Sequence, residues 1–506
     1  MSRIFDQSSS RSLEFQSANE ILGLLRSRKI GAVELLNLHV ARIKKYNPSL
    51  NAVVALDVET ALNAARQADN QKSDLRMLHG LPMTVKDGYE AVGMPTTCGF
   101  PFLADYRPQQ DADAVTHLKA AGAIVFGKTN LPSGAFDWQS YNPVYGMTTN
   151  PWDSARSPGG SSGGAAAAIA AGFTPLELGS DMGGSIRCPA AFCGVYGHKP
   201  SYGIVPMRGH IPPLPGTDMR LEMVVGGPLA RSAADLELAL DVLVAPSKHD
   251  GAAWRVRLPE PRHQRLQDFR VALWADNSGY AVDERCLEAM HAYAEDLRRL
   301  GVTVDVTARP DIDLHASYEA YLMTLLPLLA GGLAPDVRQQ FLDTAEAMGS
   351  GNLDYMARAG RAFALKRYES YAVTEQRERL YHAWRGFFDR YDLLICPVMQ
   401  TVAYQHDLRG DETGNPIHVG AARDMIVNCR SYQYLDRLQW PSLATVANLP
   451  ATAVPTGRFI DGVPMGVQVI GPYLEDRTPL RFAQLVERAL GGYQVPPAYS
   501  VPIDPN

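Results

Sequence analysis

Hydrophobic and polar residues recur along this chain with two different periods. Apolar residues three and four positions apart, such as Ile21, Leu24 and Leu25, predict amphipathic helices, whereas short apolar runs predict strands. On this basis helices are expected at 18–28, 32–46, 58–69, 115–121, 165–172, 233–244 and 284–300, and strands at 53–56, 81–87, 123–127, 270–274, 302–306, 393–396 and 463–470. The segment 314–391 is mostly helical in pattern. Strands that alternate with helices indicate an α/β protein with a large mixed sheet covered by helices on both faces.

The length of the chain sets the expected organisation. At 506 residues it exceeds the size that one simple core supports, so a large domain with insertions or several subdomains is expected. We predict an N-terminal helical region at 1–75, a core at 76–245, an α/β and helical insert at 246–390, and a C-terminal part at 391–506 whose strands and helix complete the core.

Charge and composition narrow the classes of partner. A net charge of -6 with 20% charged residues argues against nucleic acid or a membrane surface as a general partner. Residues 1–10 lack the apolar core of a secretion signal, and the apolar run Ala165–Phe173 is too short to span a bilayer. We therefore expect a cytoplasmic protein that contacts no membrane.

The cysteines and histidines do not suggest a metal centre. The 6 cysteines are scattered without a C-x-x-C pair, which is typical of free thiols in a reducing compartment. The 12 histidines show no H-E-x-x-H motif and no paired ligand spacing. No metal site and no cofactor are predicted.

Two glycine- and serine-rich segments, 157–164 and 179–187, are the most informative part of the sequence. Ten glycines fall within Gly159–Gly197, against 43 in the whole chain. Such clustering indicates tight turns or a close approach of the backbone to another group. Serines in those turns, beside free backbone N–H groups, suit acyl transfer with a hydroxyl nucleophile and an oxyanion hole.

A base for such a serine is not provided by histidine, because no Ser-His-Asp arrangement is recognisable. Lys86 is the alternative, since it ends an apolar strand (Leu81, Met83, Val85) that carries it inward. Burial lowers the pKa of a lysine and makes the neutral amine available as a base. The competing interpretation is a lysine whose stem covers apolar surface while its ammonium reaches water.

Residues 122–129 formally match the phosphate-loop pattern G-x-x-x-x-G-K-[ST]. The middle of this segment is apolar and strand-like, whereas a phosphate cradle needs a flexible loop that leads into a helix. Pro132 also follows Lys128 closely. The sequence therefore argues against nucleotide binding.

The central stretch, about 80–236, resembles the amidase signature family of serine hydrolases. The matching motifs are long and follow one another in order: Gly80–Asp87, Gly127–Asn130, Asn150–Asp153, Gly159–Gly164, Gly179–Arg187, Gly197–Pro200 and Gly227–Ser232. Weaker matches at 41–43, 51–53, 392–397 and 464–468 extend the resemblance over most of the chain, and it is weakest at about 245–390. One departure is Ser201, where the family usually has threonine.

The resemblance implies the amidase signature fold and a Ser–Ser–Lys triad within the core region. In it Ser185 is the nucleophile, Ser161 the bridging serine with a cis peptide bond, and Lys86 the base. The oxyanion hole would be formed by the backbone N–H groups of Met182, Gly183, Gly184 and Ser185. Asp181 and Arg187 are expected to hold the loop together, Ser162 to be a turn residue, and Ser157 and Ser180 to hydrogen-bond near Lys86.

The resemblance also implies an enzyme that cleaves a C–N amide bond with water, without a cofactor. In relatives the acyl pocket draws on the loop after residue 128, the segment after residue 200 and the divergent insert. Here these regions hold apolar and aromatic residues, of which some would bind substrate and others pack in the core: Gly134, Phe136, Trp138, Tyr141, Met207, Ile211–Leu214 and Leu322–Leu329. Gly134 and Phe136 are our candidates for substrate contact.

We expect a hydrolase of small to medium apolar or aryl amides, with esters and carbamates as further substrates. Two alternatives stay open: a glutaminase-type subunit that feeds ammonia to a transamidation complex and needs partner proteins, and a non-catalytic binding relative. The insert's lack of family match counts against the first alternative, and the presence of all three triad residues counts against the second. Oligomeric state stays open, with a homodimer among the options.

Overall fold

A single mixed sheet of eleven strands is the framework of the molecule. The computed structural model describes residues 12–217, 219–330, 335–349, 351–410 and 422–501. The strand order is β1-β3-β2-β6-β8-β7-β14-β15-β11-β9-β10. These strands are β1 (Val53–Leu56), β2 (Pro82–Lys86), β3 (Ile124–Thr129), β6 (Leu176–Asp181), β7 (Tyr196–Lys199), β8 (Val225–Ala230), β9 (Arg270–Leu273), β10 (Thr303–Asp305), β11 (Leu393–Pro397), β14 (Ala451–Ile460) and β15 (Val463–Ile470).

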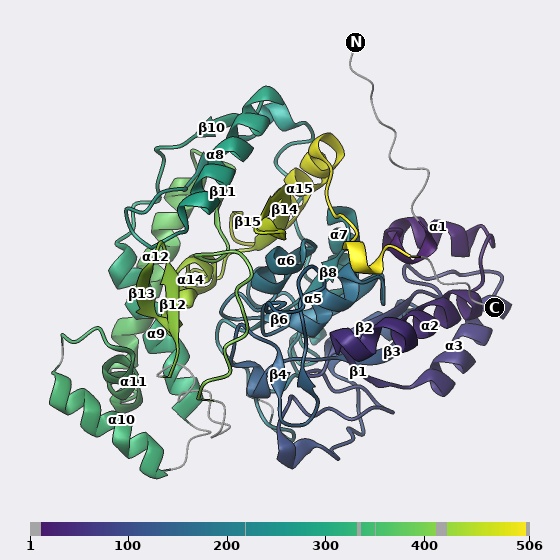
Figure 1. The fold of residues 1–506 in the computed structure, drawn as a ribbon, viewed down its shortest axis with the longest axis horizontal. Coiled ribbons are helices and arrows are strands. Elements are labelled where there is room, and N and C mark those ends of the chain that lie inside the picture. The colour runs from purple at the N-terminus through teal and green to yellow at the C-terminus, as the bar shows by residue number, and fades with distance from the viewer. Residues whose placement is uncertain (1–11, 218, 331–334, 350, 411–421, 502–506) are drawn as a thin grey trace.

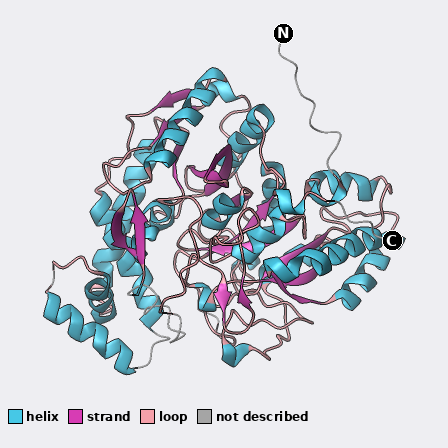
Figure 2. Ribbon diagram, viewed as in Figure 1, coloured by secondary structure: helices cyan, strands magenta, loops and turns pink. Residues whose placement is uncertain are grey.

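Helices surround this sheet (Figures 1 and 2). They are α1 (Ala18–Arg26), α2 (Ala32–Leu50), α3 (Val58–Asn70), α4 (Asp113–Ala120), α5 (Gly163–Ala170), α6 (Arg187–Cys193), α7 (Ala233–Leu243), α8 (Glu284–Arg299), α9 (Leu314–Ala330), α10 (Pro335–Met348), α11 (Tyr355–Ala364), α12 (Ser370–Phe388), α14 (Gln439–Val446) and α15 (Arg477–Leu490). Two small hairpins, β4 (Tyr141–Asn142) with β5 (Gly146–Met147) and β12 (Asp424–Val427) with β13 (Arg430–Gln433), lie outside the main sheet. The prediction of a mixed sheet flanked by helices is confirmed.

The start of α1 illustrates how local sequence fixes an element. The Ser17 hydroxyl accepts a hydrogen bond from the Glu20 N–H, and the Glu20 carboxylate accepts one from the Ser17 N–H. This reciprocal pair satisfies backbone donors that the first helical turn leaves without partners. Ile21 and Leu25 then face the core, as their spacing predicts, together with Leu22, whereas Leu24 is only partly buried.

Two parallel strand pairs determine where the chemistry-bearing residues meet. Strand β2 pairs in parallel with β3 on one side and with β6 on the other. Lys86 is the last residue of β2, and Asp181 is the last residue of β6. Because the carboxyl ends of parallel neighbours share one edge of a sheet, Lys86 and the loop after β6 come together there.

The last two strands of the chain occupy the middle of the sheet. Strand β14 pairs with β7, and β15 pairs with β11, all antiparallel. Strands β9 and β10, which belong to the predicted insert, continue the same sheet beyond β11. The predicted regions therefore share one sheet, while their boundaries stay a prediction. In the described residues, no helix combines the length and apolar character needed to cross a membrane.

Candidate active site

Lys86 is fully buried at the end of β2. Its Nζ atom lies 2.6 Å from Oγ of Ser161 and 3.0 Å from Oγ of Ser180. Burial lowers the pKa of Lys86 to about 7, although the Cys98, Asp181 and Glu177 side chains act in the opposite direction. The amine is thus available in its neutral, proton-accepting form near neutral pH. The interpretation of Lys86 as a surface-covering lysine with a hydrated ammonium is wrong.

Ser161 lies just before α5, in the first of the two glycine-rich segments. Its side chain is buried, and the Gly160–Ser161 peptide bond is cis, as the family resemblance implies. A Cβ atom at Gly160 would lie 2.4 Å from the Asp137 carbonyl oxygen, so only glycine fits at this position. The backbone itself therefore positions the Ser161 hydroxyl against Lys86.

Ser185 lies in the loop between β6 and α6 and is partly exposed. The Ser162 N–H donates a 3.0 Å hydrogen bond to the Ser185 carbonyl oxygen. This contact brings the second glycine-rich segment against the first. The three residues predicted as a triad thus belong to segments that contact one another.

A buried ion pair holds the loop that carries Ser185. Arg187 donates to both carboxylate oxygens of Asp181, at 3.0 and 2.8 Å. Burial by itself would raise the pKa of Asp181, but the charge and hydrogen bonds of Arg187 lower it to about 2. The same carboxylate accepts hydrogen bonds from the N–H groups of Gly184 and Ile186. The expectation that Asp181 and Arg187 tie the loop together is confirmed.

The backbone N–H groups of this loop have unequal roles. The Gly184 N–H donates to Asp181 and is therefore occupied, which removes Gly184 from the predicted set of oxyanion donors in this arrangement. The N–H groups of Gly183 and Ser185 have no hydrogen-bond acceptor in the part of the chain that the structure describes. Gly184 has a φ of +93°, and its Cβ atom would lie 2.9 Å from Pro441, so the turn requires glycine.

The neighbouring serines differ from one another in their roles. Ser180 contacts Lys86, as expected, whereas the Ser157 hydroxyl donates to the Trp138 carbonyl oxygen and not to Lys86. The Ser162 hydroxyl donates to the Ser180 carbonyl oxygen, which fits a turn residue. Because Ser157 also accepts from the Gly159 N–H, its short side chain stabilises its own turn instead.

Lys128 is a strand residue, as its apolar neighbours predict. It lies in β3, fully buried, and its Nζ atom donates to the Tyr89 carbonyl oxygen and to the Thr96 hydroxyl. The Asp87 carboxylate lies 3.0 Å away. This lysine is fully engaged inside the sheet, and its segment forms no phosphate cradle.

Gly134 and Phe136, the predicted substrate contacts, lie against each other on the loop after β3. Gly134 has a φ of +63°, and its Cβ atom would lie 2.7 Å from the Phe136 ring and 2.8 Å from Phe100. Two residues later the Trp138 indole donates a 2.9 Å hydrogen bond to the Gly183 carbonyl oxygen. This loop therefore reaches the segment that carries Ser185.

Several other pocket candidates pack in the core instead. Tyr141 is buried and accepts a hydrogen bond from Arg423, and Ile211 packs with Cys98 and Leu131. The leucines Leu322, Leu325 and Leu326 of α9 are likewise buried.

Sequence reasoning did not identify three residues that contact the Ser185 loop. A Cβ atom at Gly183 would lie 2.6 Å from Leu438 and 3.2 Å from the Tyr321 hydroxyl, and Pro441 touches Gly184 in the same way. These three residues lie far from the glycine-rich motifs along the chain, and no local motif marks them. Their burial pattern alone does not distinguish them from core residues.

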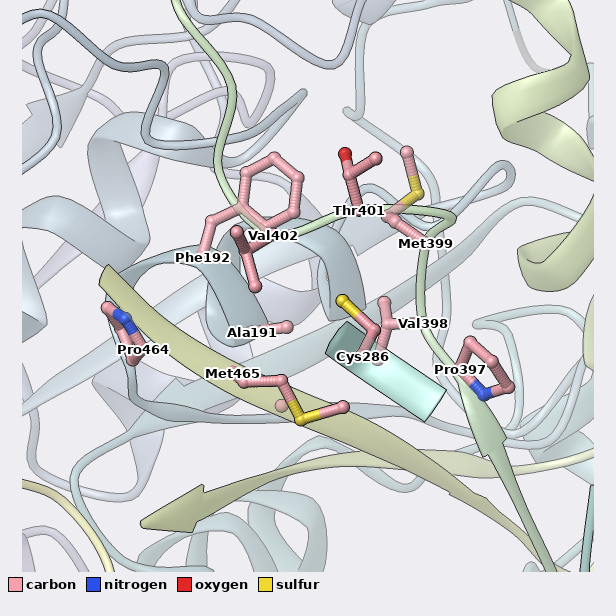
Figure 3. Close-up of a pocket in the computed structure, with 11 residues that line it drawn as sticks. Ala191, Phe192, Cys286, Pro397, Val398, Met399, Thr401, Val402, Pro464 and Met465 are labelled. Carbon is pink, nitrogen blue, oxygen red and sulfur yellow. The ribbon is translucent and has the colours of Figure 1, made fainter. Parts of the chain in front are cut away.

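A separate apolar pocket lies beside α6 (Figure 3). Ala191 and Phe192 of α6, Cys286 of α8, and Pro464 and Met465 of β15 line it together with the segment after β11. The pocket includes none of the predicted triad residues, and its lining offers no base or oxyanion donor beside a nucleophile. We do not place the chemistry there.

A family model described as Amidase matches residues 34–480, which is most of the chain. The chain belongs to the amidase signature family. Among curated relatives of this amidase, the A subunit of glutamyl-tRNA(Gln) amidotransferase from Geobacillus stearothermophilus is 31% identical over 503 residues, covering 94% of this chain and 98% of the relative. The corresponding protein of Methylococcus capsulatus is 30% identical over 501 residues, covering 95% of this chain and 98% of the relative.

Two solved structures share the fold over nearly their whole length. A bacterial aryl acylamidase of the amidase signature family superimposes with a TM-score of 0.78 at 25% identity, covering 96% of this chain and 98% of that one. A 6-aminohexanoate cyclic dimer hydrolase, solved with its substrate, gives a TM-score of 0.74 at 25% identity, with 96% and 100% coverage. The predicted family and fold are thereby confirmed.

Proposed function

We propose that this amidase is a free-standing amidohydrolase that uses Ser185, Ser161 and Lys86 as a catalytic triad. The observation that carries the proposal is the buried Lys86 amine, whose Nζ atom lies 2.6 Å from Oγ of Ser161. The segment that holds Ser161 in turn contacts the Ser185 loop. A neutral lysine accepts a proton readily at a pH near its lowered pKa of about 7.

The proposed reaction begins when Oγ of Ser185 attacks the amide carbonyl carbon. The proton of Ser185 passes to Oγ of Ser161 as the proton of Ser161 passes to Nζ of Lys86. The carbonyl oxygen becomes an oxyanion that accepts hydrogen bonds from the backbone N–H groups of Met182, Gly183 and Ser185. When the intermediate collapses, the C–N bond breaks and the amine leaves with the proton returned through Ser161. Water then hydrolyses the acyl-enzyme by the same relay.

Ser180 has a supporting role in this proposal. A neutral amine has two N–H groups and one lone pair, and an N–H directed to Ser180 leaves the lone pair for the Ser161 proton. The 3.0 Å contact therefore selects the orientation of Lys86 in which the proton relay is possible.

Apolar or aryl amides are the proposed substrates, with esters and carbamates as further ones. The side chains against the oxyanion segment and on the loop after β3 are apolar or aromatic, namely Leu438, Tyr321, Trp138 and Phe136. Apolar and aromatic side chains near a reactive serine favour substrates with apolar groups. The solved structure that is named an aryl acylamidase agrees with this assignment.

A glutaminase role is the second candidate, because the curated relatives at 30–31% identity are A subunits of an amidotransferase. In that role the same triad would release ammonia from glutamine within a complex. Steady-state hydrolysis of an aryl anilide and of glutamine by the isolated chain separates the two. Anilide cleavage without glutamine cleavage supports the amidohydrolase. Glutamine cleavage without anilide cleavage, or no cleavage of either substrate by the isolated chain, contradicts it and favours the glutaminase, which needs partner proteins.

The triad itself is tested with a fluorophosphonate probe and peptide mapping. We expect an adduct on Ser185 in the natural protein and none in Ser185→Ala. The exposed loop serine Ser278 provides a matched control, since Ser278→Ala should react like the natural protein. Folded protein that forms no adduct, or an adduct on another serine that survives Ser185→Ala, would contradict the proposed triad.

A further inference from the structure

The peptide groups around Gly183 are held from their carbonyl side by two aromatic side chains. The carbonyl oxygen of Met182 accepts a 3.2 Å hydrogen bond from the Tyr321 hydroxyl. The next carbonyl oxygen, that of Gly183, accepts a 2.9 Å hydrogen bond from the Trp138 indole N–H. Both side chains are buried.

The first of these contacts bears directly on an oxyanion donor. The Met182 carbonyl and the Gly183 N–H belong to one peptide group, and this peptide bond is trans. In a planar trans peptide the C=O and the N–H point in opposite directions. A hydrogen bond that fixes the Met182 carbonyl toward Tyr321 therefore fixes the Gly183 N–H away from Tyr321.

Tyr321 is suited to hold this peptide group rigidly. It lies on α9, which packs against α14 (Figure 1). Its side chain is completely buried. Burial, with a smaller contribution from Asp181, raises the pKa of Tyr321 far above its ordinary value. The phenol thus keeps its proton and remains a donor at every pH at which the enzyme works.

Glycine at position 183 leaves this peptide group otherwise free to rotate. A glycine has no Cβ to restrict it, and the Cβ of any other residue would collide with Leu438 at 2.6 Å. Orientation of the Gly183 N–H has to come from partners outside the loop.

We propose that Tyr321 is a positioning residue for acyl transfer, which orients the Gly183 N–H toward the developing oxyanion through its hydrogen bond to the Met182 carbonyl. The inference rests on the proposed function, because it takes Gly183 as an oxyanion donor for Ser185. Because Tyr321 belongs to the divergent insert, the insert would then affect the rate of acyl transfer as well as any contact with substrate.

The test compares Tyr321→Phe with Tyr318→Phe. Tyr318 lies on the same helix and is also buried, and its hydroxyl donates a 2.9 Å hydrogen bond to the backbone carbonyl of Leu435, which is not part of the Ser185 loop. Both changes remove one hydroxyl from one buried tyrosine. Melting temperature and circular dichroism establish that each variant is folded.

Inactivation by the fluorophosphonate probe then separates probe affinity from the bond-forming step. Loss of a whole oxyanion donor slows catalysis by about 10²–10³-fold. In Tyr321→Phe the Gly183 N–H is kept but loses its fixed orientation, so the maximal inactivation rate should fall by about 10-fold. The affinity for the probe should be unchanged. Tyr318→Phe should stay within about 2-fold of the natural protein in both quantities. If Tyr321→Phe does not fold, Tyr321→Met, which also removes the hydroxyl that holds the Met182 carbonyl, is compared with Tyr318→Met in the same way.

Equal maximal rates for Tyr321→Phe and the natural protein would overturn the inference while the triad stands. Equal losses in Tyr321→Phe and Tyr318→Phe would also overturn it, because they indicate a general effect on α9. A natural protein that forms no adduct on Ser185 refutes the proposed function itself, and this result is obtained before any tyrosine variant is compared.

Discussion

At the scale of single residues, the environment of Lys86 meets two requirements of a catalytic base. The side chain is removed from water, which favours the neutral amine, and it faces two serine hydroxyls that give the amine its hydrogen bonds. An uncompensated buried amine would be costly, so the serines make its burial tolerable. A second buried lysine, Lys199, also has its pKa lowered to about 7 by burial, but its Nζ donates to the Pro200 carbonyl oxygen.

The pH dependence of inactivation by the fluorophosphonate probe follows from the lowered pKa of Lys86. Protonated lysine cannot accept a proton, so the rate should rise about 10-fold per pH unit below about 7 and level off above it. We expect Lys86→Ala to remove this rise and to slow the reaction by roughly 10³-fold. In Lys199→Met the rise should persist. A profile that is flat through pH 7, or one that loses its rise in Lys199→Met, would contradict the role of Lys86.

At the scale of elements, strand predictions succeeded where a short apolar run was clear. The strand expected at 53–56 is β1, and the strand expected at 463–470 is β15, with the same bounds. Strands β6 and β8 were not predicted, because they contain glycine, serine or proline and are buried along their whole length. A strand buried on both faces has no alternation of apolar and polar residues.

Strand β14 was also not predicted, although a signal for it is present. Asp461 and Gly462 connect β14 to β15, with φ of 52° and 79°. Asp-Gly between two strand-like segments is typical of a tight hairpin whose central residues both have positive φ. This dipeptide would have identified the hairpin from the sequence.

Glycines within helices differ in what an added methyl group would meet. Gly23, inside α1, has no atom within 4 Å of the position of a Cβ, whereas a Cβ at Gly164 of α5 would lie 2.4 Å from the Asn130 N atom. Gly23→Ala should raise the free energy of unfolding by about 0.5–1 kcal/mol, as expected from helix propensity.

Gly164→Ala should instead lower the free energy of unfolding by about 1–3 kcal/mol, the usual cost of overpacking. Urea denaturation of both variants and of the natural protein measures the difference. The packing around α5 would be misassigned if Gly164→Ala were as stable as Gly23→Ala.

At the scale of the whole molecule, distant segments meet in ways that no local pattern reveals. The sequence indicated Ser161 and Asp181 because they lie in conspicuous glycine-rich turns, and Lys86 because it ends an apolar strand. Tyr321 and Leu438 are ordinary members of a helix and a loop by sequence, and only the path of the chain brings them to Gly183. The site is thus predictable where it is coded by a motif and unpredictable where it is formed by tertiary packing.

The shared sheet leads to a prediction for a shortened chain. A chain of residues 1–390 would lack β11, β14 and β15, so β7 would become an edge and β9 and β10 would lose their connection to the sheet. We expect this chain to aggregate or to show no cooperative unfolding, as measured by size-exclusion chromatography and circular dichroism. The full chain, prepared in parallel, is the control. A soluble monomer of 1–390 that unfolds cooperatively would mean that the predicted regions fold independently.

The position of β14 beside β7 has a consequence for biosynthesis. Strand β7 ends at Lys199, but its neighbour on one side, β14, begins only at Ala451. At ribosomal rates of about 5–20 residues per second, this edge of β7 stays unpaired for roughly ten seconds to a minute before β14 is synthesised. An unpaired strand edge is a template for association with other nascent chains. The yield of this amidase in cells is therefore expected to depend on temperature, expression rate and chaperone supply more than on the stability of the finished fold.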